Sequence, residues 1–330
     1  MELDIRWYPN FDKMKKAILL LVFLTAFSAC KKSDDPQDPV TIDDPQDPVT
    51  IDDPQDPVTI IEPFEGSTGK LLFSSGFESD TYLSEPSSEL EISNWPDYEI
   101  IRGTDASTGY SWPISILGSN FAGIHKVDDD GGAALSNDIE TVIGHNGEET
   151  TALFQSVNYD IQFTQTPYQI NNITENPEEL YMSYRMKTDD TALVGPDKWR
   201  AIWEYKTDDY ASYANGFRMI ALMVTDNQGT PHWVFQGDTS PTSPVWQVEN
   251  YDVPVIMNAW FKVEYYIKWS DAADGYASMK VNGQLIAEHY GATTTNSDNL
   301  DFIILTQVYG NSHPMHQWVD DIEIWDGVPN

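Results

Sequence analysis

The chain has little that would fix its structure covalently and little positive charge. Its 330 residues include a single cysteine, Cys30, so no disulfide bond can form within the chain. Lysine and arginine together number 18 against 53 acidic residues, and the formal net charge is −35. After residue 62 the imbalance is still 12 basic to 40 acidic residues. Nucleic acid is therefore excluded as an expected partner, because binding to phosphates needs a broad basic surface.

A long hydrophobic run is also missing. The apolar stretch from Ala17 to Phe27 is only 11 residues long, which is too short to span a bilayer. A basic start at Met14 precedes this stretch, and the small residues Ser28 and Ala29 come directly before Cys30. This order predicts a secretory signal peptide over residues 1–29 with Met14 as the true start. Phe27 stands where a lipoprotein signal usually has leucine.

The residues that follow predict a tethered surface protein. If Cys30 carries lipid, the membrane is contacted through the anchor alone. The sequence from Lys31 to Asp35 resembles the acidic tract that follows the lipid cysteine in surface-exposed lipoproteins of Bacteroidetes. This resemblance implies a location at the cell surface, on the outer membrane.

Residues 34–60 consist of three copies of Asp-Asp-Pro-Gln-Asp-Pro-Val-Thr-Ile. Proline recurs too often for a helix or a central strand. The segment is acidic and poor in aromatic residues, so we expect an extended, solvated stalk. The predicted organisation is a lipidated cysteine and linker over residues 30–62, followed by one domain over residues 63–330.

That domain is predicted to be all-β, since no segment shows sustained helical periodicity. Short alternating runs are separated by clusters of Gly, Asn, Asp and Pro. Asn282-Gly283 predicts a tight hairpin turn, and residues 80–115 are expected to be irregular. Many short strands predict a two-sheet jelly-roll sandwich. The strands are expected at residues 70–77, 151–158, 180–187, 199–206, 216–225, 231–236, 244–249, 259–269, 275–281, 284–289, 300–309 and 317–325.

The strand at residues 199–206 alternates between two kinds of side chain. A strict period of two places Trp199, Ala201, Trp203 and Tyr205 on a core face, and Arg200, Ile202, Glu204 and Lys206 on the other. Six of the twelve cations after residue 62 lie between Arg185 and Arg218. Such a concentration fits either a solvated face with local ion pairs or a groove that holds an anionic ligand.

The second half of the chain carries a family resemblance. The stretch from Trp260 to Ser270 is followed by Asp274-Gly275, by Val281-Asn282-Gly283 and, near the end, by Trp318-Val319-Asp320-Asp321-Ile322. This order resembles concanavalin A-like jelly rolls, and heparin lyase I-like polysaccharide lyases in particular, over roughly residues 180–327. The same short motifs occur in lectin-like and glycosidase relatives.

The resemblance implies that the chain cleaves an acidic polysaccharide by β-elimination. Tyr309 would protonate the leaving oxygen, and Gln307, on the same strand face, would also line the groove. Carboxylates of the substrate would be held by Arg185, Arg200 and Arg218, beside Glu204. These lyases often carry Gln-x-His where this chain has Glu204 and Lys206. The base is therefore Lys206 or a histidine, with His145 and His313 as the candidates.

Two other functions fit the sequence. A non-catalytic glycan-binding lipoprotein would stack sugars on Trp203, Trp233 or Trp246. A glycoside hydrolase needs two carboxylates that flank the bond, and the usual Glu-x-Asp-x-x-Glu motif is absent. We expect a monomer that requires no cofactor. A structural calcium ion is the one metal that the acidic residues could hold, with Glu78 and Asp320 as one pair and Asp128 and Asp130 as the other.

Overall fold

The computed structural model is all-β over the residues that it describes, which confirms the predicted fold class. Those residues are 66–84, 98–112, 122–125, 135–157, 168–172, 177–189, 193–207, 216–240, 244–295, 300–307, 309–311 and 315–329. The chain divides into two units, residues 1–61 and residues 62–330, and every described residue belongs to the second. Cys30 and the repeats lie outside the described residues.

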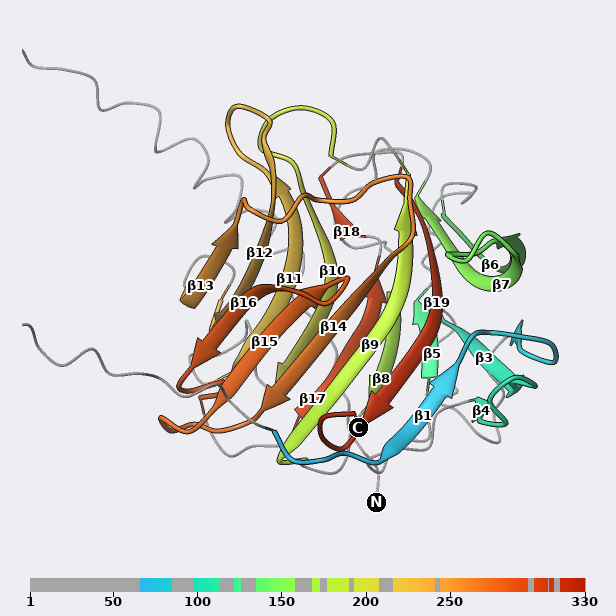
Figure 1. Ribbon diagram of the computed structural model, residues 1–330, viewed down its shortest axis with the longest axis horizontal. Helices are drawn as coiled ribbons and strands as arrows, with labels where there is room; N and C mark the ends of the chain where they lie inside the picture. The colour runs from blue at the N-terminus through green and yellow to red at the C-terminus, as the bar shows by residue number, and fades with distance from the viewer. Residues whose placement is uncertain are drawn as a thin grey trace, which may run out of the picture. The chain divides into compact units, whose positions relative to one another are not determined.

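Eight of the described strands form one sheet, called here the smaller sheet (Figure 1). Their order is β16-β15-β14-β9-β19-β7-β6, and β1 pairs with β19. All these pairings are antiparallel. The strands are β1 (Leu71–Ser75), β6 (Leu135–Ile143), β7 (Glu149–Val157), β9 (Glu179–Thr188), β14 (Phe261–Lys268), β15 (Tyr276–Val281), β16 (Gln284–Tyr290) and β19 (Met315–Trp325).

The other eleven described strands form the larger sheet. Its order is β13-β12-β11-β10-β17-β8-β5-β3-β2, with β18 beside β10 and β4 beside β3. The strands are β2 (Tyr82–Ser84), β3 (Tyr98–Thr104), β4 (Ser111–Trp112), β5 (Ala122–His125), β8 (Tyr168–Asn172), β10 (Trp199–Thr207), β11 (Arg218–Thr225), β12 (Pro231–Asp238), β13 (Pro244–Asn250), β17 (Leu300–Gln307) and β18 (Tyr309–Gly310).

Alternation along the strands builds the core between the two sheets. On β14, Val263 and Tyr265 are buried in the core, whereas Lys262 and Glu264 alternate with them on the outer face. Trp203 of the larger sheet stacks on Tyr265 of the smaller one, with ring centroids 4.6 Å apart. A large aromatic and aliphatic interior of this kind supplies the main driving force for folding.

Of the local predictions, the hairpin turn is confirmed and the irregular segment is wrong. Val281 ends β15 and Gln284 begins β16, so the hairpin turn at Asn282-Gly283 is confirmed. Both turn residues have positive φ, 49° and 76°, as the tight turn requires. The prediction that residues 80–115 are irregular is wrong, because β2, β3 and β4 lie there. Among the described residues, no helix is long and apolar enough to cross a membrane.

Candidate functional site

Two cations and two carboxylates meet on the outer face of the larger sheet. The Lys206 ammonium lies 2.6 Å from the Glu204 carboxylate on the same strand, β10. Arg218 on β11 donates from Nη2 to the Asp238 carboxylate at 2.8 Å, and its Nη1 lies 3.8 Å from Glu204. Gln236 donates to the same Asp238 oxygen at 2.8 Å. We call these five residues the charged network.

The register of three strands explains why the charged network forms. Lys206 lies opposite Arg218, and Arg218 lies opposite Asp238, so the three occupy one row across β10, β11 and β12. Glu204 and Gln236 lie one row away, two residues along their strands, on the same face. Two like charges side by side, Lys206 and Arg218, are thus each matched by a carboxylate.

Burial makes this network a fixed arrangement. Asp238 is fully buried and Glu204 nearly so, while Lys206 keeps 21% of its side chain exposed. Buried charges are tolerated only when they are paired and hydrogen-bonded. Arg218 and Lys206 are therefore held in one geometry before any ligand arrives. Their N–H groups can act as preorganised donors toward an anion.

Arg200 does not join this network, and the prediction that it shares a face with Glu204 and Lys206 is wrong. The register of β10 shifts between Ala201 and Trp203, which marks a β-bulge. A bulge inserts one residue, so side chains before it point to the opposite face from the one that alternation predicts. Arg200 is consequently fully buried between the sheets.

The interior contacts of Arg200 belong to the smaller sheet. Its Nη2 donates to the side-chain oxygen of Gln317 at 2.8 Å and to the backbone oxygen of His316 at 3.4 Å. Burial lowers the pKa of Arg200 to about 10, and the nearby charge of Asp189 partly opposes this shift. A guanidinium in this position ties the two sheets together and is closed to a ligand on the outer face.

The three tryptophans predicted to stack on sugars all face the interior. Trp203 and Trp233 have no exposed surface. Trp246 is half-buried, packs against the core and stacks on His289 with centroids 4.3 Å apart. Stacking on a sugar requires an accessible ring face, so the prediction is wrong for Trp203 and Trp233. The imidazole of His289 already stacks on the ring of Trp246, where a sugar would have to lie.

Arg185 and His145 lie with the smaller sheet. Arg185 is on the outer face of β9 and donates to Asp321 at 3.1 Å. His145 follows β6, and its Nε2 lies 3.8 Å from the same carboxylate. The expectation that Arg185 and Arg218 line one trough is therefore wrong, since they project from different sheets.

The predicted acid occupies a strand next to β10. Tyr309 lies opposite Ala201 in the pairing of β18 with β10, and Gln307 ends β17. The side chains of both residues, and all of His313, lie outside the described part of the structure. Sequence reasoning misses Gln236 and Asp238, although the alternation of His232, Val234, Gln236 and Asp238 places both on one face of a strand.

The predicted calcium pair is brought together. The Thr150 hydroxyl lies 2.9 Å from Glu78 and 3.1 Å from Asp320. Burial, and then the charges of Asp321 and Glu78, raise the pKa of Asp320 to about 7, against opposing hydrogen bonds. Excess negative charge among oxygen ligands suits a calcium ion.

Two carboxylates are still fewer than a calcium ion needs. Within the described ranges, no three His, Cys, Asp or Glu side chains are grouped closely enough to hold a metal ion. Glu78, Asp320 and the hydroxyl of Thr150 would supply only part of the ligands of such an ion, and calcium stays a prediction. Asp128 and Asp130 lie outside the described residues.

Comparison with known proteins finds similarity to solved structures only. No protein-family model and no curated protein matches the chain. Among solved structures, it is similar to an endo-β-1,4-glucuronan lyase from the fungus Trichoderma reesei, with 14% identity, a TM-score of 0.43 and coverage of 62% of this chain and 94% of that one. The alginate lyase Aly36B shows 12% identity, a TM-score of 0.42 and coverage of 57% and 82%.

A third similar structure is the binding domain of botulinum neurotoxin DC, with 14% identity, a TM-score of 0.37 and coverage of 60% of this chain and 45% of that one. The three TM-scores all lie below 0.5, and the identities are 14% or less. No residue role is transferred from them.

Proposed function

We propose that this chain acts on an acidic polysaccharide and cleaves it by β-elimination on the outer face of the larger sheet. The observation that carries the proposal is the charged network. Arg218 and Lys206 are fixed there by buried carboxylates and offer N–H donors at a defined position. Donors held in this way bind a uronate carboxylate without ordering themselves first.

Within this proposal, Lys206 binds substrate and does not abstract the proton. Its ammonium is already ion-paired with Glu204. It also lies five residues along β10 from Ala201, the position that Tyr309 faces, which corresponds to roughly 15 Å of strand. His313, four residues after Tyr309, is the better candidate for the base.

The chemistry is then divided among three groups. Arg218 and Lys206 hold carboxylates of the polymer at a distance along β10 from the bond that is cleaved, and so fix its position on the sheet. His313 removes the proton next to the carboxylate, and Tyr309 gives a proton to the leaving oxygen. The products are a new chain end and an unsaturated uronide.

The test is ultraviolet absorbance of unsaturated uronides during incubation with glucuronan, alginate and glycosaminoglycans. We expect one of these polymers to give product, and Tyr309→Phe and His313→Ala to abolish it. Lys206→Met should raise KM more than it lowers kcat. Lys280→Met, an exposed cation on the smaller sheet, is the matched control. Folded wild-type protein that yields no product from any polymer contradicts the lyase proposal.

Non-catalytic glycan binding is the second candidate function. Both cations of the network are paired with carboxylates, and such an arrangement can recognise an anionic sugar without chemistry. Affinity electrophoresis in gels that contain each polymer separates the two functions. Retention that Lys206→Met weakens, without any unsaturated product, favours the binding protein.

The surface location is part of the same proposal. A lipid on Cys30 would hold the domain at the membrane through the acidic stalk. Labelled palmitate should be incorporated by the wild-type chain in its bacterial host and not by Cys30→Ser. Equal labelling of both would overturn the anchor.

A further inference from the structure

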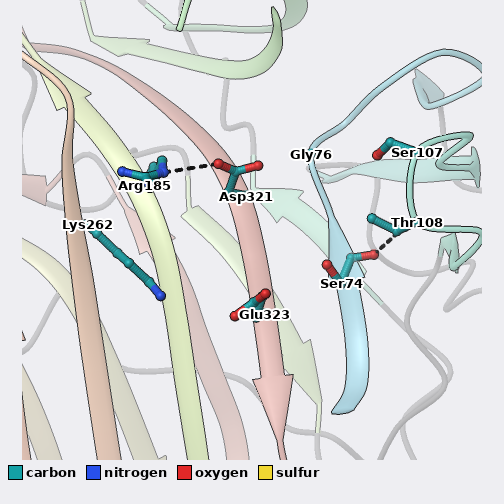
Figure 2. Close-up of a pocket in the computed structure, with 8 residues that line it drawn as sticks. All are labelled: Ser74, Gly76, Ser107, Thr108, Arg185, Lys262, Asp321 and Glu323. Atoms are coloured by element: carbon teal, nitrogen blue, oxygen red, sulfur yellow. Dashed lines mark hydrogen bonds and ion pairs between the residues drawn. The ribbon is translucent and has the colours of Figure 1, made fainter. Parts of the chain in front are cut away.

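A polar cavity lies on the outer face of the smaller sheet, away from the charged network. Its volume is about 270 Å³, and it is formed where β1 and the turn at residues 105–109 stand beside β19 (Figure 2). Aromatic and aliphatic side chains are absent from its lining, which is drawn from described residues. The lining consists of Ser74, Gly76, Ser107, Thr108, Arg185, Lys262, Asp321 and Glu323.

One edge of this cavity carries an unmatched positive charge. Lys262 on β14 lies directly opposite Arg185 on β9, and like charges in that position repel. Arg185 is compensated by Asp321 at 3.1 Å. Across the described residues, no ion pair or hydrogen bond involves the Lys262 ammonium, although Figure 2 shows its side chain extending toward β9. An anionic group from a ligand would relieve this repulsion.

Hydrogen-bond acceptors follow across the next two strands. Asp321 and Glu323 project from β19, and Ser74, opposite Glu323, projects from β1 (Figure 2). Asp321 keeps 53% of its side chain exposed. The cavity therefore has cations on one side, carboxylates in the middle and hydroxyls on the far side.

Asp105 lies behind the hydroxyl side of the cavity and holds its backbone in place through hydrogen bonds. Its buried carboxylate accepts hydrogen bonds from the Ser75 hydroxyl at 2.8 Å and the Gly76 amide at 2.7 Å. It also accepts from the amide of Ser107 at 2.8 Å. Burial alone would raise the pKa of Asp105, but the hydrogen bonds from Ser107, Ser75 and Gly76 outweigh it and leave the pKa below its ordinary value. The cavity wall is thus fixed before a ligand binds.

We propose that this cavity binds one sugar acid of the uronate type. Its volume lies just below the roughly 300–1,000 Å³ of sites for drug-sized ligands, so one ring is the right scale. The carboxylate of the ligand pairs with Lys262 and Arg185, and its hydroxyls donate to Asp321 and Glu323. Inorganic phosphate is a dianion, so Asp321 and Glu323 would repel it more strongly than they repel a uronate. A neutral sugar would leave the charge of Lys262 unpaired.

The identity of the molecule that carries this uronate rests on the proposed function. A uronate within the polymer that the larger sheet handles would reach this cavity as a second contact. Two contacts on one polymer raise the apparent affinity through effective concentration. Binding of the free sugar acid, however, does not depend on cleavage.

The experiment measures D-glucuronate binding to the full chain by ligand-observed NMR and calorimetry, with D-glucose and inorganic phosphate as comparison probes. All measurements are made in the background of Lys206→Met, which removes one of the two cations of the charged network and so weakens its contribution. We expect glucuronate to bind more tightly than either comparison probe. Lys262→Met and Glu323→Gln should each weaken it tenfold or more, since each removes a charged hydrogen bond.

Two matched variants complete the test. Lys262→Arg, which keeps the charge, should retain binding, and Lys280→Met, an exposed cation on β15, should leave it unchanged. Equal binding of glucose, tighter binding of phosphate, or full affinity in Lys262→Met would each overturn the inference. Failure of the lyase assay alone leaves these results standing, so the two proposals fail separately.

Discussion

The outer faces of the two sheets use charged residues in opposite ways. On the larger sheet, Arg218 and Asp238 come from adjacent strands and bind each other in a nearly dry environment. On the smaller sheet, Arg185 and Asp321 form a pair with 30% and 53% of their side chains exposed. The first arrangement fixes side chains in one geometry, whereas the second leaves them free to exchange partners with a ligand.

Breaking the buried pair should have the largest effect on stability. Asp238→Asn keeps the shape of the side chain but leaves Arg218 and Gln236 facing a neutral amide. We expect a loss of about 3–5 kcal/mol in the free energy of unfolding, because the arginine charge stays buried with a weakened partner. Urea unfolding at neutral pH measures it.

The matched variant on the other sheet is Asp321→Asn. Asp321 has a positive φ of 51°, which asparagine also tolerates, so the backbone should not be strained. We expect a loss of only about 0–1 kcal/mol, as for exposed pairs in general. Equal losses for the two variants would contradict the contrast between the faces.

Asp105 provides an intermediate case, because it is buried beneath the exposed face. Asp105→Asn should cost about 1–3 kcal/mol through the loss of its charged hydrogen bonds. Its pKa lies below the ordinary value, so the unfolded chain takes up the proton first as the pH falls.

The pH dependence follows from that order. The contribution of Asp105 is complete above the ordinary carboxyl pKa of about 3.9 and is lost as the pH falls through the lower native value. The difference in stability between wild type and Asp105→Asn should therefore be largest at neutral pH and shrink below about pH 4. A difference that grows with acidity would show that the carboxylate is not the stabilising form.

Added salt should change the stabilities least, and it should separate the exposed pair from the buried pair. At 1 M salt the screening length is about 3 Å, so exposed pairs lose most of their attraction. The small difference between wild type and Asp321→Asn should disappear in 1 M sodium chloride, while that for Asp238→Asn should persist. Urea titrations at low and high salt check this. Loss of the Asp238→Asn difference in salt would mean that water reaches the network.

The strands and the core could be predicted from the sequence because alternation reports burial directly. The run at residues 199–206 places Glu204 and Lys206 on one face, and they share it in the structure. Arg200 could not be placed by the same rule, because a bulge at Ala201–Trp203 inverts the faces before it. The adjacent apolar residues Ile202 and Trp203 are the local sign of that bulge.

The site was harder to predict than the fold because it depends on which strands are neighbours. Six cations between Arg185 and Arg218 look like one cluster in the sequence, yet β9 and β11 belong to different sheets. Asp238 completes the network only because β12 pairs with β11 in a register that places it opposite Arg218. Sequence order carries no information on that pairing. Trp203 and Trp233 show the same limit, since their aromatic rings suit sugar stacking and core packing equally well.

The most direct test of the account is the affinity for a defined acidic oligosaccharide, such as a glucuronan hexasaccharide, measured by calorimetry at low salt. Wild type and Lys280→Met should bind equally, and Lys206→Met should bind roughly tenfold more weakly, because it loses one charged contact. An unchanged affinity in Lys206→Met would contradict the claim that the charged network on the larger sheet is where the polysaccharide binds.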